Sequence, residues 1–202
     1  MDPREFGAAA NLLGLALPDD RLSSLARFSD LLVQRAVALG LVAEGDRERI
    51  VERHVSDCLR AASLVTPEDR VAYDLGSGAG LPGIVVAIAA PDLAVRLVET
   101  RRKAIAFLEL AIAELGLPNA VVVPRRAEDL ADPADLCFAR AVASIARSWE
   151  LAAPVLHPRG RLVYFAGRRG RVPTALPLAT SVRTVENLRL ETSGPLVIIT
   201  RE

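Results

Sequence analysis

The chain has 202 residues, of which 51% are hydrophobic and 25% charged, and its formal net charge is zero. This composition is typical of one globular domain and excludes a disordered chain, while the balanced charge argues against a surface that is basic throughout. Without an apolar run of about 18 residues, a signal-peptide pattern or a Cys-x-x-Cys pair, the sequence predicts a cytoplasmic protein with no membrane span and no bound metal. We expect its two cysteines, Cys58 and Cys137, to be buried thiols.

The region from about residue 20 to residue 64 has a helical pattern. Leu22, Leu25 and Phe28 begin a series of apolar residues at three- and four-residue steps, which predicts one helix. A second helix is predicted within residues 47–65, and it ends before Pro67. Because no strand pattern occurs here, we expect residues 1–66 to form an N-terminal helical cap.

Short apolar runs alternate with helical stretches in the remaining chain. Strands are predicted at residues 70–75, 93–99, 119–123, 135–140, 161–166, 181–188 and 195–201, with helices at about 81–90, 101–116 and 144–156. This alternation is typical of a parallel sheet covered on both faces, and the last two strands, with no long helix between them, predict an antiparallel hairpin or edge. Residues 67–202 are therefore predicted to form a Rossmann-like α/β core with a mostly parallel seven-stranded sheet, in one compact unit with the cap.

The stretch YDLGSGAGLPG, from Tyr73 to Gly83, follows the first predicted strand and precedes a helix. Open α/β sheets bind ligands at this edge, and residues 78–83 match the Gly-x-Gly-x-x-Gly spacing of dinucleotide enzymes. Two residues argue against NAD, because Asp74 would repel a pyrophosphate and Pro82 removes an amide that would bind phosphate. A ligand with an ammonium group, a sulfonium and a ribose fits better, so we expect S-adenosylmethionine. Its contacts here are predicted at Asp74, Gly76, Gly78 and Gly80.

Acidic residues follow the second and third predicted strands. Glu99 ends the second strand, where a carboxylate accepts both ribose hydroxyls of an adenosine, a feature that NAD enzymes share. Glu128 or Asp129 follows the third strand and could accept a hydrogen bond from the exocyclic amine of an adenine. Each of these acids could instead be an ordinary solvated carboxylate in a loop.

The end of the fourth strand, CFARAVASI, bears on the methyl acceptor. It lacks the Asn/Asp-Pro-Pro-aromatic turn that is typical of methylation at an exocyclic base amine. Methylation of a cytosine carbon needs a cysteine nucleophile, and Cys137 lies inside the strand, where we expect a core thiol. Arg140 is a cation at the sheet edge. It could bind a phosphate, a guanine edge or the carboxylate of the cofactor, or form a salt bridge with Asp135 or Glu99.

These residues together resemble the bacterial 16S ribosomal RNA methyltransferase G family, also called the glucose-inhibited division protein B family. The resemblance runs from about Arg53 to Phe165 and includes RHVSDCL, GSGAGLPG, the Lys-x-x-x-Phe-Leu helix from Lys103, the Arg-Ala-Glu turn and FARAVASI. It implies a class I methyltransferase that methylates N7 of a guanine in 16S ribosomal RNA. On the family pattern, the cofactor contacts fall on Gly76, Leu81, Ala127, Glu128 and Arg140.

Guanine N7 carries a lone pair and no proton, so this reaction needs in-line placement but no general base. We therefore expect no catalytic residue in the usual sense, apart from a positioning role that Arg140 could have. The partner that the resemblance implies is 16S ribosomal RNA or the assembling small subunit, and we expect the protein to act as a monomer.

Basic residues at the rim of the pocket are candidates for RNA contact. The first hundred residues carry 10 basic and 15 acidic side chains and the rest carry 15 and 10, which could orient a polyanion or simply reflect scattered charge. Candidates for RNA contact are Arg101, Arg102, Lys103, Arg125, Arg126, Arg159, Arg161, Arg168, Arg169 and Arg171, and the last five could instead belong to a solvated loop after the fifth strand. His54, three residues before Asp57 on the second helix, could contact the substrate or have a surface or capping role.

The sequence departs from the family in two places. VQRAVALGLVA stands where the family has Trp-Asn and Asn-Leu-Thr segments, and Ala166-Gly167 stands where the family often has Lys-Gly. Two other functional classes stay open: a methyltransferase for a small molecule, and an NAD-dependent enzyme or non-catalytic binding module with the same glycine loop.

Overall fold

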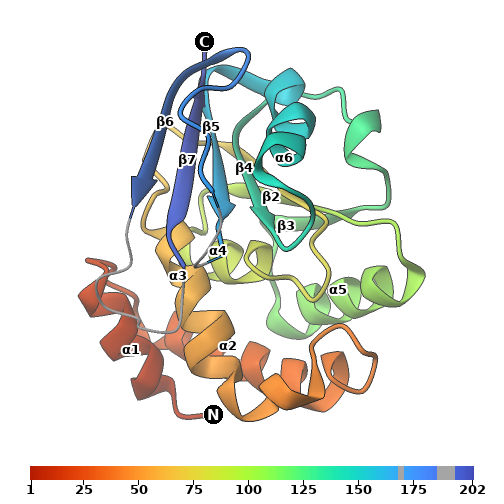
Figure 1. The fold of residues 1–202 in the computed structure, drawn as a ribbon. Coiled ribbons are helices and arrows are strands. Elements are labelled where there is room, and N and C mark those ends of the chain that lie inside the picture. Colours follow the sequence, from red (N-terminus) through yellow and green to blue (C-terminus); the bar gives the residue numbers. More distant parts are fainter. Residues whose placement is uncertain (168–170, 186–193) are drawn as a thin grey trace.

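Seven strands form one sheet in the order β3-β2-β1-β4-β5-β7-β6 (Figure 1). The structure, a computed structural model, describes residues 1–167, 171–185 and 194–202. Neighbouring strands are parallel from β3 to β5, whereas β7 runs antiparallel to both β5 and β6. The strands are β1 Val71–Leu75, β2 Ala94–Val98, β3 Ala120–Val123, β4 Ala134–Arg140, β5 Leu156–Phe165, β6 Ala179–Val185 and β7 Leu196–Arg201. The predicted fold class is confirmed, including the antiparallel end of the sheet.

Apart from α1, the helices occupy the predicted places, with differences in their type. The α-helices are α1 Pro3–Leu12, α2 Asp19–Leu31, α3 Ser56–Ala62, α4 Gly83–Ala89, α5 Arg102–Leu115 and α6 Ile145–Ala152. The second predicted N-terminal helix is composite, because a 3-10 turn (Glu44–Arg49) and a π-helical turn (Ile50–Val55) precede α3. A π-helical turn (Leu32–Ala36) likewise extends α2, and 3-10 turns occur at Ala127–Asp129 and Ala153–Val155.

Helix α1 was not predicted from the sequence. Its start has a local explanation, because the side chain of Asp2 accepts a hydrogen bond from the backbone N–H of Arg4 at 2.9 Å and Pro3 occupies the first turn. Phe6 and Ala10, one helical turn apart, are its buried residues. Two buried positions are too few for a periodic pattern to be recognised.

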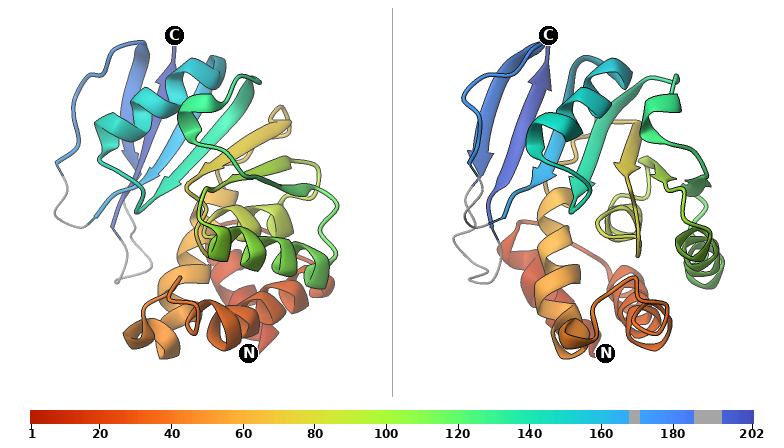
Figure 2. Two further views of the ribbon diagram at one scale, coloured as in Figure 1. Left: turned by 90° about the vertical axis from the view of Figure 1, so that its right-hand side faces the viewer. Right: turned by 45° about the vertical axis from the view of Figure 1, so that its right-hand side comes forward.

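Helices cover both faces of the sheet (Figure 2). One hydrophobic cluster joins the N-terminal helices, α4, α5 and one sheet face, with Phe28, Phe107 and Phe138 among its members. A second cluster lies on the other face, where Trp149 of α6 packs with Tyr73 and other buried residues of the strands. The N-terminal helices therefore share a continuous core with the sheet, and they lie below the strand ends that carry the candidate site.

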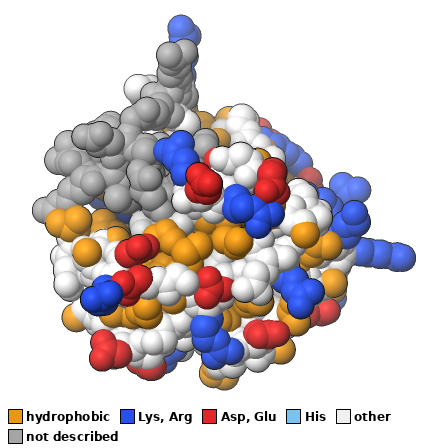
Figure 3. All heavy atoms as spheres, turned by 90° about the horizontal axis from the view of Figure 1, so that it is seen from below, with side chains coloured by type: hydrophobic (Ala, Val, Ile, Leu, Met, Phe, Trp, Pro, Cys, Tyr) orange, Lys and Arg blue, Asp and Glu red, His pale blue; other side chains and the backbone are white. Residues whose placement is uncertain are grey.

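The outer face of the N-terminal helices carries mixed side chains. In the coloured part of Figure 3, hydrophobic side chains lie among basic and acidic ones, with no large area of one sign. Such a face lacks the concentrated basic charge that a phosphate backbone attracts. Within the described ranges, no helix is long and apolar enough to cross a bilayer.

Candidate functional site

The glycine loop connects β1 to α4 and lies tightly against its neighbours. Gly76 has φ +66°, and a Cβ added there would lie 2.4 Å from a methyl group of Val142 in the segment after β4. A Cβ on Gly83, at the start of α4, would lie 2.5 Å from Oδ2 of Asp74. Glycine is therefore required at both positions, by backbone conformation and close approach at the first and by close approach at the second. The loop brings its backbone to the carboxyl edge of the sheet.

Asp74 lies behind this loop. The residue is 1% exposed, and Oδ2 of its carboxylate accepts a hydrogen bond from the backbone N–H of Gly83 at 3.0 Å. Burial raises the pKa of Asp74 to about 7, although the Gly83 hydrogen bond and the positive charge of Arg140 act in the opposite direction. The structure thus places a carboxylate that is costly to ionise directly beneath the loop, as often occurs at functional sites.

Glu99 follows β2 and accepts hydrogen bonds through both of its oxygens. Its Oε2 accepts from the backbone N–H of Gly78 at 3.0 Å, and its Oε1 accepts from those of Thr100 and Arg101 at 2.8 and 2.9 Å. The guanidinium of Arg101 also contacts Oε2, at 3.1 Å. Burial opposes ionisation, but the hydrogen bonds from Arg101 and Thr100 outweigh it and hold the pKa of Glu99 below its usual value. The carboxylate is thus fixed next to the glycine loop.

Arg140 ends β4 and connects the sheet to the helical cap. Its guanidinium donates to the Sγ of Cys58 at 2.9 Å and lies 3.6 Å from the carboxylate of Asp57. It also lies over the ring of Phe165, 5.4 Å from the centroid. One alternative from the sequence was a salt bridge of Arg140 with Asp135 or Glu99, and the structure shows a salt bridge with a different acid, Asp57. The carboxylate of Asp135 accepts hydrogen bonds from two backbone N–H groups at the start of β1.

His54 lies between Arg140 and an acid of the helical cap. Its Nδ1 is 3.0 Å from Nη2 of Arg140, and its Nε2 is 3.2 Å from Oδ2 of Asp46. Because arginine can only donate, Nδ1 is the acceptor and Nε2 carries the hydrogen that points to Asp46. The structure therefore brings Arg140 to His54 and Asp57, which lie more than 80 residues earlier in the sequence.

Two cavities adjoin at the glycine loop and have Gly76 in common. The first, of about 310 Å³, lies between the loop, the end of β4 and the cap; it is lined by Leu41, Val42, Ala43, His54, Gly76, Ser77, Gly78, Ala79, Leu81, Arg101, Arg140 and Ala141. The second, of about 250 Å³, lies over the ends of β2 and β3; it is lined by Gly76, Val98, Glu99, Thr100, Arg125, Arg126, Ala127, Glu128, Val142, Ala143, Arg147 and Leu151. Together they form one elongated site along the carboxyl edge of the sheet.

Most of the predicted cofactor residues line these cavities. The exceptions are Asp74 and Gly80, which belong to the loop region but are in neither set of lining residues. Among the predicted RNA contacts, Arg102 and Lys103 are exposed at the start of α5, outside both cavities. Arg168 and Arg169 lie outside the described residues.

Three features of the site were not anticipated as cofactor contacts. Residues 41–43, in the cap, line the first cavity and fall in the stretch that departs from the family pattern. Residues 141–143 separate β4 from α6 and contribute to both cavities. Arg147 of α6 pairs with Glu128 at 2.6 Å, a contact that the sequence indicates only through the opposite charges. The apolar residues among them carry no chemical signal of their own.

A model of the family "rRNA small subunit methyltransferase G" matches residues 21–175. The chain belongs to this family. The resemblance inferred from the sequence is therefore confirmed. Among relatives in the rRNA small subunit methyltransferase G family, the protein from Acidothermus cellulolyticus is 41% identical over 143 residues, 71% of this chain and 64% of that protein. The protein from Salinispora tropica is 40% identical over 174 residues, 82% of this chain and 70% of that protein.

The chain spans less than two thirds of the length of some relatives that it matches: 64% of the Acidothermus protein and 66% of a relative from a Nocardioides species. Solved structures with the same fold are more distant. A S-adenosylmethionine-dependent methyltransferase from Aquifex aeolicus has a TM-score of 0.58 at 14% identity, over 83% of this chain and 98% of its own. TYW2 from P. horikoshii, solved with MeSAdo, has a TM-score of 0.54 at 16% identity, and the match covers 73% of this chain and 61% of TYW2. These likenesses show the fold.

Proposed function

We propose that this protein transfers the methyl group of S-adenosylmethionine to N7 of a guanine in small-subunit ribosomal RNA. Family membership gives the reaction class. The observation that carries the proposal for this chain is the pair of adjoining cavities, one beside Glu99 and the other beside Arg140 and His54. A ligand with an adenosine at one end and an amino acid at the other fits such an elongated site.

The residues present fit this methyl donor. The fixed carboxylate of Glu99 is suited to the two ribose hydroxyls, and Ala127 and Glu128 would border the adenine. The guanidinium of Arg140 is suited to the carboxylate of the amino acid end. Arg101 contacts both oxygens of Glu99, and because its side chain is 63% exposed it can turn away when the ribose binds.

The donor supplies an electrophilic methyl group on its sulfonium. Guanine N7 already has a lone pair, so the protein has to hold the two reactants in line and exclude water, and no proton has to be removed.

Neither cysteine is suited to act as a nucleophile. Burial raises the pKa of the Cys58 thiol to about 12 and raises that of Cys137 as well. His54, held between Asp46 and Arg140, is suited to orienting Arg140.

The acceptor that we propose is 16S ribosomal RNA, free or in the assembling small subunit, met in the cytoplasm by a monomeric enzyme. Calorimetry with S-adenosylhomocysteine and with NAD tests the cofactor part. We expect binding of S-adenosylhomocysteine and none of NAD. Binding of NAD alone would favour an oxidoreductase with the same loop and would contradict the proposal.

Glu99→Gln is expected to weaken the binding of S-adenosylhomocysteine about tenfold or more. The neutral amide loses the charge-assisted hydrogen bonds to the ribose, each of which contributes about 1.5–3 kcal/mol. The measurement is isothermal calorimetry, with Glu109→Gln as a matched control because Glu109 is exposed on the outer face of α5. Equal affinity of the Glu99 variant and the wild type would place the adenosine elsewhere.

A further inference from the structure

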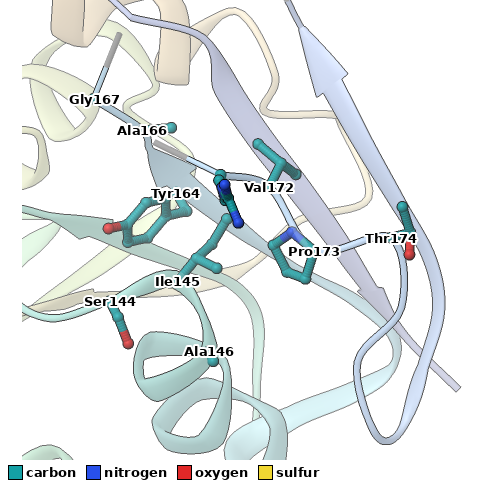
Figure 4. Close-up of a pocket in the computed structure, with 10 residues that line it drawn as sticks. Ser144, Ile145, Ala146, Tyr164, Ala166, Gly167, Val172, Pro173 and Thr174 are labelled. Atoms are coloured by element: carbon teal, nitrogen blue, oxygen red, sulfur yellow. The ribbon is translucent and has the colours of Figure 1, made fainter. Parts of the chain in front are cut away.

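A third cavity, of about 620 Å³, lies next to the candidate site (Figure 4). It is bounded by the first turn of α6, the end of β5 and residues 171–174, which lead towards β6. No described residue that lines it also lines either of the two cavities assigned to the methyl donor. The proposed function leaves this cavity without an occupant.

The third cavity is separated from the donor site by one short stretch of chain. Ala141, Val142 and Ala143 border the donor cavities, and Ser144 and Ile145, which follow directly, border the third cavity. This stretch is held in place from the side of β5, since the hydroxyl of Tyr164 donates to the carbonyl of Ala143 at 2.9 Å. An occupant of the third cavity would thus lie beside the donor site without touching the donor.

Adjacent residues of β5 serve the two sites. Phe165 lies under the guanidinium of Arg140 at the donor site, whereas Tyr164 lines the third cavity. Successive side chains of a strand point to opposite faces, so the ring of Phe165 supports Arg140 whereas the ring of Tyr164 faces the third cavity. Phe165 is in neither described donor-cavity lining, so of these two rings only that of Tyr164 would contact a substrate that spans both sites.

The lining has the chemistry that recognises a nucleotide. In Figure 4, Tyr164 lies on one side of the cavity and Val172 and Pro173 on the other, with Ile145 between them. These surfaces suit the flat apolar faces of a base, and stacking on aromatic rings is tolerant of sequence. Polar groups are provided by Ser144, Thr174 and Arg171, and none of the described lining residues is acidic. A guanidinium without an acid in the lining suits a phosphate.

We propose that this cavity binds a nucleobase next to the target guanine in the RNA strand, stacked on Tyr164, with Arg171 at its phosphate. The inference rests on the proposed function and adds a second nucleotide subsite to it. A flanking base is preferred to the target itself because the lining of this cavity and that of the donor cavities have no residue in common.

The test compares Tyr164→Leu, which removes the ring, with Tyr164→Phe, which keeps the ring and removes the hydrogen bond to Ala143. Unmodified small ribosomal subunits are the substrate, and the KM for subunits is measured together with the affinity for S-adenosylhomocysteine. We expect the KM of the leucine variant for subunits to be about tenfold above that of the wild type, because it loses the stacking of a base on the ring. The phenylalanine variant should have the wild-type KM, and both variants should bind S-adenosylhomocysteine with wild-type affinity.

Arg171→Gln tests the phosphate contact. The logarithm of the affinity for small subunits falls linearly with the logarithm of the salt concentration. Removal of one phosphate contact to a single strand should make this negative slope less steep by about 0.7. The control is Arg70→Gln, because Arg70 is exposed before the amino end of β1, at the opposite edge of the sheet. An unchanged slope for Arg171→Gln would contradict the phosphate contact.

The outcomes separate the inference from the proposed function. If wild-type protein methylates the subunits but the leucine variant has a KM within twofold of wild type, the third cavity is not a base subsite and the function stands. A leucine variant that loses affinity for S-adenosylhomocysteine in parallel would show a structural role for Tyr164 and also overturn the inference. Failure of the wild-type protein to methylate subunits would overturn both.

Discussion

Asp57→Ala is expected to lower the free energy of unfolding by about 3–5 kcal/mol, because it leaves two arginines without their buried partner. Oδ1 of Asp57 is 2.9 Å from Nη1 of Arg60, and its Oδ2 is 3.6 Å from Nη2 of Arg140. The three side chains are only 9%, 5% and 17% exposed. Arg60 also donates to the carbonyl of Gly194 beside β7, so the change affects the junction of the cap with the sheet. Urea denaturation measures the loss.

An exposed ion pair provides the control for this prediction. Glu150 pairs with Arg147 at 3.1 Å, but its side chain is 63% exposed, so Glu150→Ala should change the free energy of unfolding by less than about 1 kcal/mol. Asp57→Asn, which keeps the shape but removes the charge, should be intermediate. A loss for Asp57→Ala as small as that for Glu150→Ala would mean that the buried network does not hold the cap to the sheet.

Asp74→Asn is expected to stabilise the protein at pH 8 while it impairs the site. The folded-state pKa of Asp74, about 7, is raised above the ordinary 3.8. The folded state therefore favours the protonated carboxyl. Its contribution to the free energy of unfolding is fully present below pH 3.8 and is lost as the pH rises through 7. The asparagine variant has no such loss and can still accept the Gly83 hydrogen bond. At about 1.4 kcal/mol for each pKa unit, the rise from 3.8 to about 7 gives an advantage at pH 8 on the order of 4 kcal/mol.

Urea denaturation at pH 8 and pH 4 tests this prediction, since the advantage should shrink to less than about 1 kcal/mol at the lower pH. Asp69→Asn is the contrasting variant: Asp69 is also buried but pairs with Arg161 at 2.7 Å, so its replacement should destabilise at pH 8. An advantage of Asp74→Asn that does not depend on pH would contradict the account of a buried, costly carboxylate.

The same variant separates two roles of Asp74 in binding. S-adenosylmethionine carries a positive sulfonium that S-adenosylhomocysteine lacks, so loss of a nearby negative charge should weaken the first ligand more than the second. We expect about a tenfold loss for S-adenosylmethionine at pH 8 and a clearly smaller one for S-adenosylhomocysteine, both measured by calorimetry. Equal losses would show that Asp74 acts only through the shape of the glycine loop.

The sequence was sufficient for the parts of the site that depend on local order. Gly76 and Glu99 each follow a strand, and because the carboxyl ends of parallel strands lie at one edge, their nearness follows from the strand predictions. The alternation of short apolar runs with helices likewise predicts the sheet, and the missing helix before the last strand predicts its antiparallel end.

The parts that depend on how the cap packs could not be predicted in this way. Asp57 and Arg140 meet only because α3 lies over the end of β4, and no local pattern sets that contact. Residues 41–43 line a cavity although they are Leu, Val and Ala, which occur equally in any core. Asp74 shows the same limit, because its place at the end of β1 is visible in the sequence but its burial behind Gly83 is not.

Methyl transfer to guanine N7 can be measured directly by mass spectrometry of small-subunit RNA that has been incubated with the purified protein and isotopically labelled S-adenosylmethionine. We predict one labelled 7-methylguanine at a single position of 16S RNA, and none with S-adenosylmethionine omitted. Label on another atom or another base, or no label in RNA from subunits that lack the modification, would contradict it.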